Sequence, residues 1–200
     1  FTPAEVSELL TRLGTVGKTE INKVYDPACG SGGFLVSTIN WFRECIKHRL
    51  GYVHPDGSVK LDGELSKEEK MLVASQIKDL AGKNILGTDF DNHLTRIAKM
   101  YMIMVDDGNS GIFTANALTP LSDLQANTGR IKEGCCDVIL TNPPFGTKGK
   151  ISRKDILEQF DLGYKWKKSS ETGKYTICDK IEKNMLGGKK KGDGQIPDVL

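Results

Sequence analysis

Long apolar runs are missing from this sequence, and so are the cysteine and histidine patterns of metal sites. No apolar stretch approaches the roughly 20 residues that a membrane-spanning helix needs, and no signal peptide is visible. The five cysteines include no CxxC pair, and the three histidines are isolated from one another. This usage is typical of reduced thiols in a cytoplasmic protein. The sequence therefore favours a globular protein with neither a disulfide framework nor a metal site.

The chain is short, and its charge is unevenly spread. Two hundred residues can bury one good core, so we expect a main domain over residues 1–146 and a loop-rich extension over 147–200. Residues 1–145 hold 15 Lys/Arg and 18 Asp/Glu, a net charge of −3, whereas residues 146–200 have a net charge of +5. A basic extension can lie beside a polyanion, although a solvated lysine-rich loop has the same composition.

Expected strands and helices alternate through the first domain. Strands are predicted at 21–25, 84–91, 112–115 and 137–141. Helices are predicted at 2–13, from 34 onward, at 66–80 and at 94–105, with a small hairpin over 51–65 and a loop or short helix over 117–130. This alternation is typical of βαβ units, so we expect an α/β fold with a mostly parallel sheet, incomplete on its C-terminal side.

Two helix starts carry capping signals. Thr2 can cap the first helix, with Pro3 at its first helical position and Glu5 completing a capping box. Ser66 and Glu69 predict a second capping box.

The pattern is weaker beyond Gly146. Helices are predicted at 153–160 and 177–186, and a mobile loop at 187–195. The sequence stops at "IPDVL", where another element is expected to start, so we expect it to be part of a longer protein.

A glycine-rich turn follows the first predicted strand, in "DPACGSGGF" (26–34). Ligands bind at the carboxyl ends of the strands in open parallel sheets, and Gly30, Gly32 and Gly33 let backbone N–H groups approach a ligand closely. The spacing is not GxGxxG, and Asp26 disfavours a pyrophosphate. Asp26 favours the ammonium of an amino acid instead. The alternative is a strand-to-helix turn that binds nothing.

Polar side chains also follow the second and third strands. A carboxylate at Asp89 can accept both hydroxyls of a ribose, and Phe90 can flank an adenine ring. Asn116 is a candidate for the adenine edge, although a turn asparagine is nearly as common there. Asp91 is expected to cap the next helix. Together the residues at these strand ends predict a site for a nucleoside that carries an amino acid, namely S-adenosyl-L-methionine.

The motifs "FTP", "VYDPACGSGGFLVST", "GTDFD", "NAL" and "DVILTNPPFG" occur in this order over about residues 1–146. The series resembles the N6-adenine DNA methyltransferases, and most closely the modification (M) subunit of type I restriction-modification systems. The resemblance implies a Rossmann-like, S-adenosylmethionine-dependent methyltransferase fold. It assigns cofactor contacts to Thr2, Pro3, Asp26, Ala28, Gly30, Gly32, Asp89, Phe90 and Asn116. Double-stranded DNA and the specificity (S) and restriction (R) subunits are the implied partners.

The loop "NPPF" carries the implied catalysis through Asn142, Pro143, Pro144 and Phe145. The N6 amine of adenine is a poor nucleophile because its lone pair is delocalised into the ring. The Asn142 side-chain carbonyl and the Pro143 backbone carbonyl can hold its protons, while Pro144 stiffens the turn. Phe145 can stack on the base, which must first leave the duplex. Without the cofactor residues, the same tetrapeptide reads as a strand terminator with a core phenylalanine.

Three other functions stay open at this stage. One is a protein-glutamine methyltransferase, whose substrate amide nitrogen is a poor nucleophile for the same electronic reason. Such enzymes carry a related NPPY loop, whereas this sequence has phenylalanine at position 145. A catalytically inactive module that binds cofactor or partner subunits is a second alternative. A dehydrogenase is a distant third because the glycine spacing is wrong. The basic residues expected near DNA phosphates are Lys148, Lys150, Arg153, Lys154, Lys165, Lys167 and Lys168.

Overall fold

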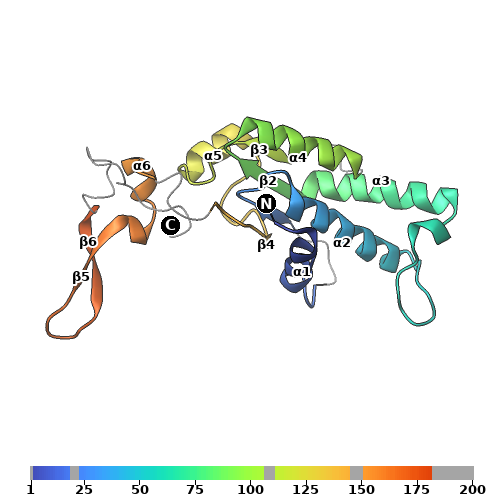
Figure 1. Ribbon diagram of the computed structural model, residues 1–200, viewed down its shortest axis with the longest axis horizontal. Coiled ribbons are helices and arrows are strands. Elements are labelled where there is room, and N and C mark those ends of the chain that lie inside the picture. The colour runs from blue at the N-terminus through green and yellow to red at the C-terminus, as the bar shows by residue number, and fades with distance from the viewer. Residues whose placement is uncertain (1, 19–22, 106–110, 145–150, 182–200) are drawn as a thin grey trace. The chain divides into compact units, whose positions relative to one another are not determined.

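The computed structural model describes residues 2–18, 23–105, 111–144 and 151–181, apart from the side chains of 179–181 (Figure 1). The chain forms two compact units. The first comprises residues Phe1–Ala117 with Asn127–Asn142, and the second comprises Leu118–Ala126 with Pro143–Leu200.

A four-stranded parallel sheet organises the first unit. Its strands are β1 (Val24–Asp26), β2 (Ile85–Asp89), β3 (Ile112–Thr114) and β4 (Val138–Ile139), in the order β3-β2-β1-β4. Val24 lies in register with Ile85 on one side and with Val138 on the other. The expected α/β architecture with a parallel sheet is confirmed, so the carboxyl ends of all four strands meet at one edge.

Helices surround this sheet within the first unit (Figure 1). They are α1 (Ala4–Gly14), α2 (Gly33–Arg49), η1 (Asp62–Glu64), α3 (Lys67–Asn84) and α4 (Asn92–Met104). Most of α5 (Leu121–Thr128) belongs to the second unit. No helix in the described part of the chain is long and apolar enough to span a membrane.

The main core forms where α2, α3 and α4 pack on the sheet. Leu35, Ile39, Phe42 and Ile46 recur at helical spacing, as the sequence predicted, and each is fully buried. They cluster with Val73, Ile77 and Ala81 of α3, Ile85 of β2, Ala98 and Met102 of α4, and Ile112 of β3. A smaller cluster joins Val24, Phe34, Val138 and Leu140. The sheet is therefore held rigidly beneath the loops at its carboxyl edge.

The two capping predictions have different outcomes. Ser66 accepts the Glu69 N–H, and the Glu69 carboxylate accepts the Ser66 N–H, so that capping box is confirmed. The prediction for the first helix is wrong. The N-cap of α1 is Pro3, with no side-chain capping bond, because the Thr2 hydroxyl is engaged elsewhere.

The segment between α2 and α3 makes a short excursion from the sheet. The expected hairpin is limited to one antiparallel bridge between Val53 and Val59. Lys47 of α2, which is 5% exposed, anchors the segment by donating to the Lys60 carbonyl and the Asp62 carboxylate. That ion pair lowers the pKa of Asp62.

The second unit contains α6 (Lys154–Leu157), η2 (Asp161–Gly163) and an antiparallel pair, β5 (Tyr164–Lys168) and β6 (Tyr175–Ile181). The helix expected at 153–160 is present but shorter. The helix expected at 177–186 is wrong for residues 177–181, which are extended and paired with β5. Threonine and isoleucine favour strands, and pairing with a neighbouring strand decides such a short segment. The loop expected at 187–195 lies outside the described residues.

We expect Gly87→Ala to destabilise the first unit. A Cβ at Gly87 would lie 2.8 Å from Leu35 Cδ1 and 3.3 Å from Cys29. Overpacking of this kind costs about 1–3 kcal/mol of unfolding free energy. Gly63→Ala is the matched control, because nothing lies within 4 Å of its added Cβ. Equal denaturant midpoints for the two variants would contradict this packing.

Candidate functional site

The glycine turn after β1 is bound tightly to the neighbouring strand. The Cys29 N–H donates to the Thr88 carbonyl over 2.9 Å, and the Thr88 hydroxyl donates to the Pro27 carbonyl over 3.1 Å. Gly30 and Gly32 both have positive φ, at +52° and +92°. A Cβ at Gly32 would also lie 3.3 Å from Ala98 Cβ, so glycine serves both the turn and the approach of α4.

The Asp89 carboxylate joins this turn to the end of β2. Its Oδ2 accepts the Gly30 N–H and its Oδ1 accepts the Asp91 N–H, both over 2.9 Å. Asp89 is 9% exposed. An ionised carboxylate has about four acceptor positions, so two bonds leave capacity for ligand hydroxyls. Asp91 caps α4 through the His93 and Leu94 N–H groups, as the sequence predicted.

Asp26, at the end of β1, is nearly completely buried. It is 1% exposed, and its Oδ1 accepts the Ala28 N–H over 3.0 Å. Burial raises the pKa of Asp26 to about 7, against hydrogen bonds from Ala28 and Thr141 that lower it, and the negative charge of Asp89 adds to the rise. Burial, with the charges of Asp26 and Asp89, also raises the pKa of the Cys29 thiol. The turn is therefore a place where a cation relieves electrostatic repulsion.

The loop after β4 lies beside these residues. Thr141 hydrogen-bonds to the Asp26 carboxylate, and the Asn142 side-chain Nδ2 donates to the Thr2 hydroxyl over 3.0 Å. Thr2, the glycine turn and residues 141–142 thus meet at one sheet edge. Pro143 is half-buried and Pro144 is exposed, whereas Phe145 lies outside the described residues.

The other predicted residues lie on neighbouring strand ends. Phe90 follows β2 and is 76% exposed, so its ring can flank a planar ligand. Asn116 is exposed two residues after β3, and the Ala115 N–H before it donates to the Asp89 carbonyl over 2.9 Å. Pro3 is exposed at the start of α1, and Ala28 is half-buried within the turn.

Sequence reasoning missed two threonines of the site. Thr88 is fully buried, and its hydroxyl also pairs with the Tyr25 hydroxyl over 2.8 Å. A polar residue inside a buried strand was the available signal for Thr88. Thr141 had no comparable signal, because its bond to Asp26 depends on the pairing of β4 with β1.

These groups combine two chemical capacities. Two carboxylates at adjacent strand ends favour a ligand that carries positive charge and hydroxyl groups. A fixed side-chain amide beside them can accept hydrogen bonds from an amino group. Among the described residues, no three His, Cys, Asp or Glu side chains gather as metal ligands.

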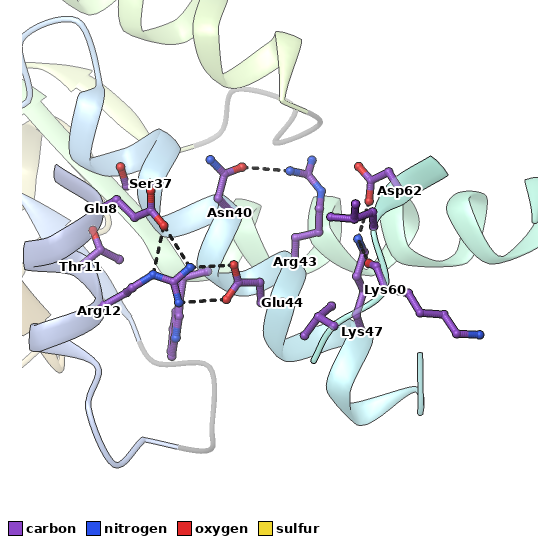
Figure 2. Close-up of a pocket in the computed structure, with 13 residues that line it drawn as sticks. Glu8, Thr11, Arg12, Ser37, Asn40, Arg43, Glu44, Lys47, Lys60 and Asp62 are labelled. Atoms are coloured by element: carbon purple, nitrogen blue, oxygen red, sulfur yellow. Dashed lines mark hydrogen bonds and ion pairs between the residues drawn. The ribbon is translucent and has the colours of Figure 1, made fainter. Parts of the chain in front are cut away.

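A cavity of about 370 Å³ lies elsewhere, between α1, α2 and residues 59–62 (Figure 2). Figure 2 shows that most of its charged side chains pair with one another, whereas Arg43 bonds to Asn40. Arg12 bonds to Glu44 at 2.9 Å and to Glu8 at 3.0 Å, and Lys47 reaches Asp62. None of the predicted cofactor or catalytic residues lines it. Because most of its charges are already paired within the protein and none of the predicted site residues lines it, we place the candidate site at the sheet edge.

Comparison with known proteins points to the same chemistry. The sequence profile of the family described as N-6 DNA Methylase matches residues 1–177. The chain is 28% identical over 160 residues to the type I restriction enzyme MpnII methylase subunit of Mycoplasma pneumoniae, covering 78% of this chain and 23% of that protein.

A second relative is the type II restriction enzyme and methyltransferase RM.BcgI of Heyndrickxia coagulans. It is 24% identical over 193 residues, covering 96% of this chain and 25% of that protein. The chain thus spans about a quarter of the length of both curated relatives.

Among solved structures, the chain is similar to a modification subunit of a putative type I restriction enzyme from Vibrio vulnificus YJ016. That similarity has a TM-score of 0.48 at 23% identity and covers 80% of this chain and 26% of the other.

We expect Asp26 to make folding stability depend on pH. Its pKa is 3.8 in the unfolded chain and about 7 in the fold, so the native state binds more protons between these values. The free energy of unfolding therefore falls as pH rises from 4 to 7, by an amount on the order of a few kcal/mol. Asp26→Asn removes this contribution.

Denaturation curves of the ligand-free protein at pH 4 and pH 7 measure the effect. The difference between the two curves should shrink in Asp26→Asn. The exposed Asp79→Asn controls for the loss of one negative charge. An Asp26→Asn protein with the wild-type pH dependence would show that Asp26 is ionised throughout.

Proposed function

The chain belongs to the N-6 DNA methylase family, and on that premise we propose that it catalyses transfer of a methyl group from S-adenosyl-L-methionine to N6 of an adenine in double-stranded DNA. The profile match over residues 1–177 confirms the N-6 DNA methylase family that the motifs predicted. We further propose that the chain acts as the modification subunit of a type I restriction-modification system. Its similarity to a type I methylase subunit supports that assignment. Specificity and restriction subunits are then its partners.

The hydrogen bond between Asn142 and Thr2 carries the proposal. An amide has a donor end and an acceptor end, and the donor end of Asn142 is held by the Thr2 hydroxyl. The acceptor end, Oδ1, is left to receive a hydrogen bond from an amino group. The N-terminal segment thereby sets which end of the amide is available, before any substrate binds.

Two acceptors are needed to activate the adenine amine. Asn142 Oδ1 takes one amino proton, and the Pro143 carbonyl takes the other. Holding both protons turns the nitrogen lone pair outward, away from the ring system. Pro143 and Pro144 restrict the backbone, so the acceptors keep their positions without an entropic cost at the moment of reaction.

The adenine must leave the duplex to reach this loop. Phe145 is proposed to stack on the extruded base, which offsets part of the unstacking energy. Base–aromatic contacts of this kind contribute roughly 1–3 kcal/mol.

The strand-end residues fit the proposed cofactor. When bound, S-adenosyl-L-methionine supplies a methyl group on a positively charged sulfonium. The negative region of Asp26 and Asp89 suits that charge, and the free acceptor positions of Asp89 suit a ribose. Gly30 and Gly32 keep the turn free of side chains, and Ala28 lies beside Asp26. Phe90 and Asn116 are proposed to contact the adenine ring, and Pro3 to cover the methionine end.

We expect Asn142→Ala and Asp89→Ala to affect different steps. Loss of the Asn142 carbonyl should lower kcat at least 100-fold, the usual effect of removing one preorganised transition-state group, while cofactor affinity stays nearly unchanged. Loss of the Asp89 carboxylate should weaken cofactor binding. Isothermal titration with S-adenosylmethionine and mass spectrometry of N6-methyladenine in DNA, both on the full-length protein, measure the two effects.

The same assays separate the remaining alternatives. Methylation of a glutamine-bearing peptide instead of DNA would replace our proposal with a protein-glutamine methyltransferase. Cofactor binding without methyl transfer to either substrate would indicate an inactive module. Full turnover by Asn142→Ala would refute the role of the amide.

We expect Thr2 to act on catalysis through Asn142. Thr2→Val keeps the shape of the side chain but removes the oxygen that accepts the Asn142 Nδ2 hydrogen bond. The Asn142 side-chain amide can then rotate and exchange the positions of its donor and acceptor ends. The loss of one such hydrogen bond, about 0.5–1.5 kcal/mol, should lower kcat roughly 2- to 12-fold. Thr2→Ser keeps the hydroxyl and should retain activity.

The cofactor dissociation constant distinguishes this role from direct cofactor contact. Thr2→Val should leave that constant unchanged if Thr2 positions Asn142. A weakened cofactor complex with an unchanged kcat would return Thr2 to the cofactor site.

A further inference from the structure

The β5–β6 pair is a two-stranded antiparallel ribbon with two different faces. Lys168 pairs with Tyr175, and Trp166 pairs with Ile177. Residues that pair directly across antiparallel strands share a face. One face therefore carries Trp166, Ile177, Tyr175 and Lys168, and the other carries Lys167 and Thr176. The register shifts between Tyr164 and Trp166, so Lys165 lies outside this regular pairing.

Both faces of the ribbon are exposed. Trp166 is 39%, Ile177 43% and Tyr175 62% exposed, and the lysines at 165, 167, 168 and 174 are all exposed. Residues 164–178 hold four lysines and a single acidic residue, Glu171, for a net charge of +3. A solvated lysine-rich loop would explain the charge but not an exposed tryptophan and tyrosine on the same two strands.

The ribbon is ordered at both ends. The Trp166 indole N–H donates to the Asp161 carbonyl over 3.1 Å, and the Tyr164 hydroxyl donates to the Glu158 carbonyl over 3.0 Å. At the turn, the Ser169 N–H donates to the Lys174 carbonyl over 2.8 Å, and Gly173 takes a positive φ of +67°. Lys168 Nζ lies 5.8 Å from the centre of the Tyr175 ring. A surface held in this way can bind a partner with little ordering cost.

We propose that this ribbon is a second contact for double-stranded DNA, with Lys168 on a phosphate and with Trp166 and Tyr175, on the same face, packed against the groove. The proposal rests on the proposed function, which supplies DNA as the substrate. Two strands lie only about 4.8 Å apart, so a ribbon fits a major groove about 12 Å wide.

The salt dependence of duplex binding tests the electrostatic part. The variant Lys168→Gln, on the face that carries Trp166 and Tyr175, should lower the slope of log affinity against log salt by about 0.9, the contribution of one phosphate contact. The control is Lys67→Gln, which removes the same charge from an exposed position on α3 and should leave the slope unchanged. A fluorescent 30-base-pair duplex and the full-length protein serve for all measurements.

Loss of an aromatic contact should change duplex affinity in a different way from loss of a lysine. Tyr175→Ala should weaken duplex binding severalfold at every salt concentration without changing the slope, because the ring carries no charge. Thermal denaturation of each variant, compared with the unaltered protein, shows whether the fold is retained. Equal slopes for the ribbon and control variants would overturn the proposal, as would a failure of the unaltered protein to bind duplex DNA.

The measurements distinguish failure of the ribbon hypothesis from failure of the proposed methyltransferase function. Normal adenine methylation with equal slopes would remove the ribbon and leave catalysis intact. A reduced slope in the ribbon variant, without any methyl transfer, would leave a DNA-binding surface on a protein with another activity. If the ribbon variants bind duplex DNA normally but lose binding to an acidic protein, the ribbon contacts a protein partner, and its proposed role on DNA is overturned.

Discussion

The hydrogen bond from the Gly30 amide to the Asp89 carboxylate is the contact on which the site depends. It joins the turn after β1 to the end of β2, across 59 residues of sequence. The second oxygen of Asp89 accepts the Asp91 amide, and Asp91 in turn caps α4. One carboxylate therefore sets the turn and the start of the helix that packs behind it. Because Gly30 takes a positive φ there, the turn also depends on glycine.

Negative charge has a structural cost at this edge. Burial and the charge of Asp89 raise the pKa of Asp26 to about 7, so the carboxylate is destabilised in the ligand-free protein. Stability given up in this way is common at sites that bind an oppositely charged group. A cationic ligand offsets the repulsion, which links binding to deprotonation of Asp26. We regard this coupling as the physical basis for the cofactor preference that we propose.

The first helix serves the site through its packing as well as through its sequence. Ser7 and Thr11 are buried along α1, and Gly14 lies against Leu140 and Val138 beside β4. These small side chains let the helix lie close to α2 and to the edge of the sheet. Thr2, two residues before the start of α1, is thereby placed beside the loop after β4, where its hydroxyl accepts a hydrogen bond from the Asn142 amide. A segment at one end of the chain thus completes a site whose other half lies 140 residues away.

Local rules were sufficient for much of this protein. The periodicity of α2, the capping box at Ser66 and the alternation of strands and helices specified the parallel sheet, and the motif order identified the family. Local rules failed where a side chain or strand had a distant partner. Thr2 leaves its capping position because Asn142 is available to it, and residues 177–181 extend because β5 pairs with them. The sequence by itself determined which chemical groups stand at the strand ends. Only the tertiary structure decided which of them touch, because hydrogen bonds between residues far apart depend on how the strands pair and not on local propensity.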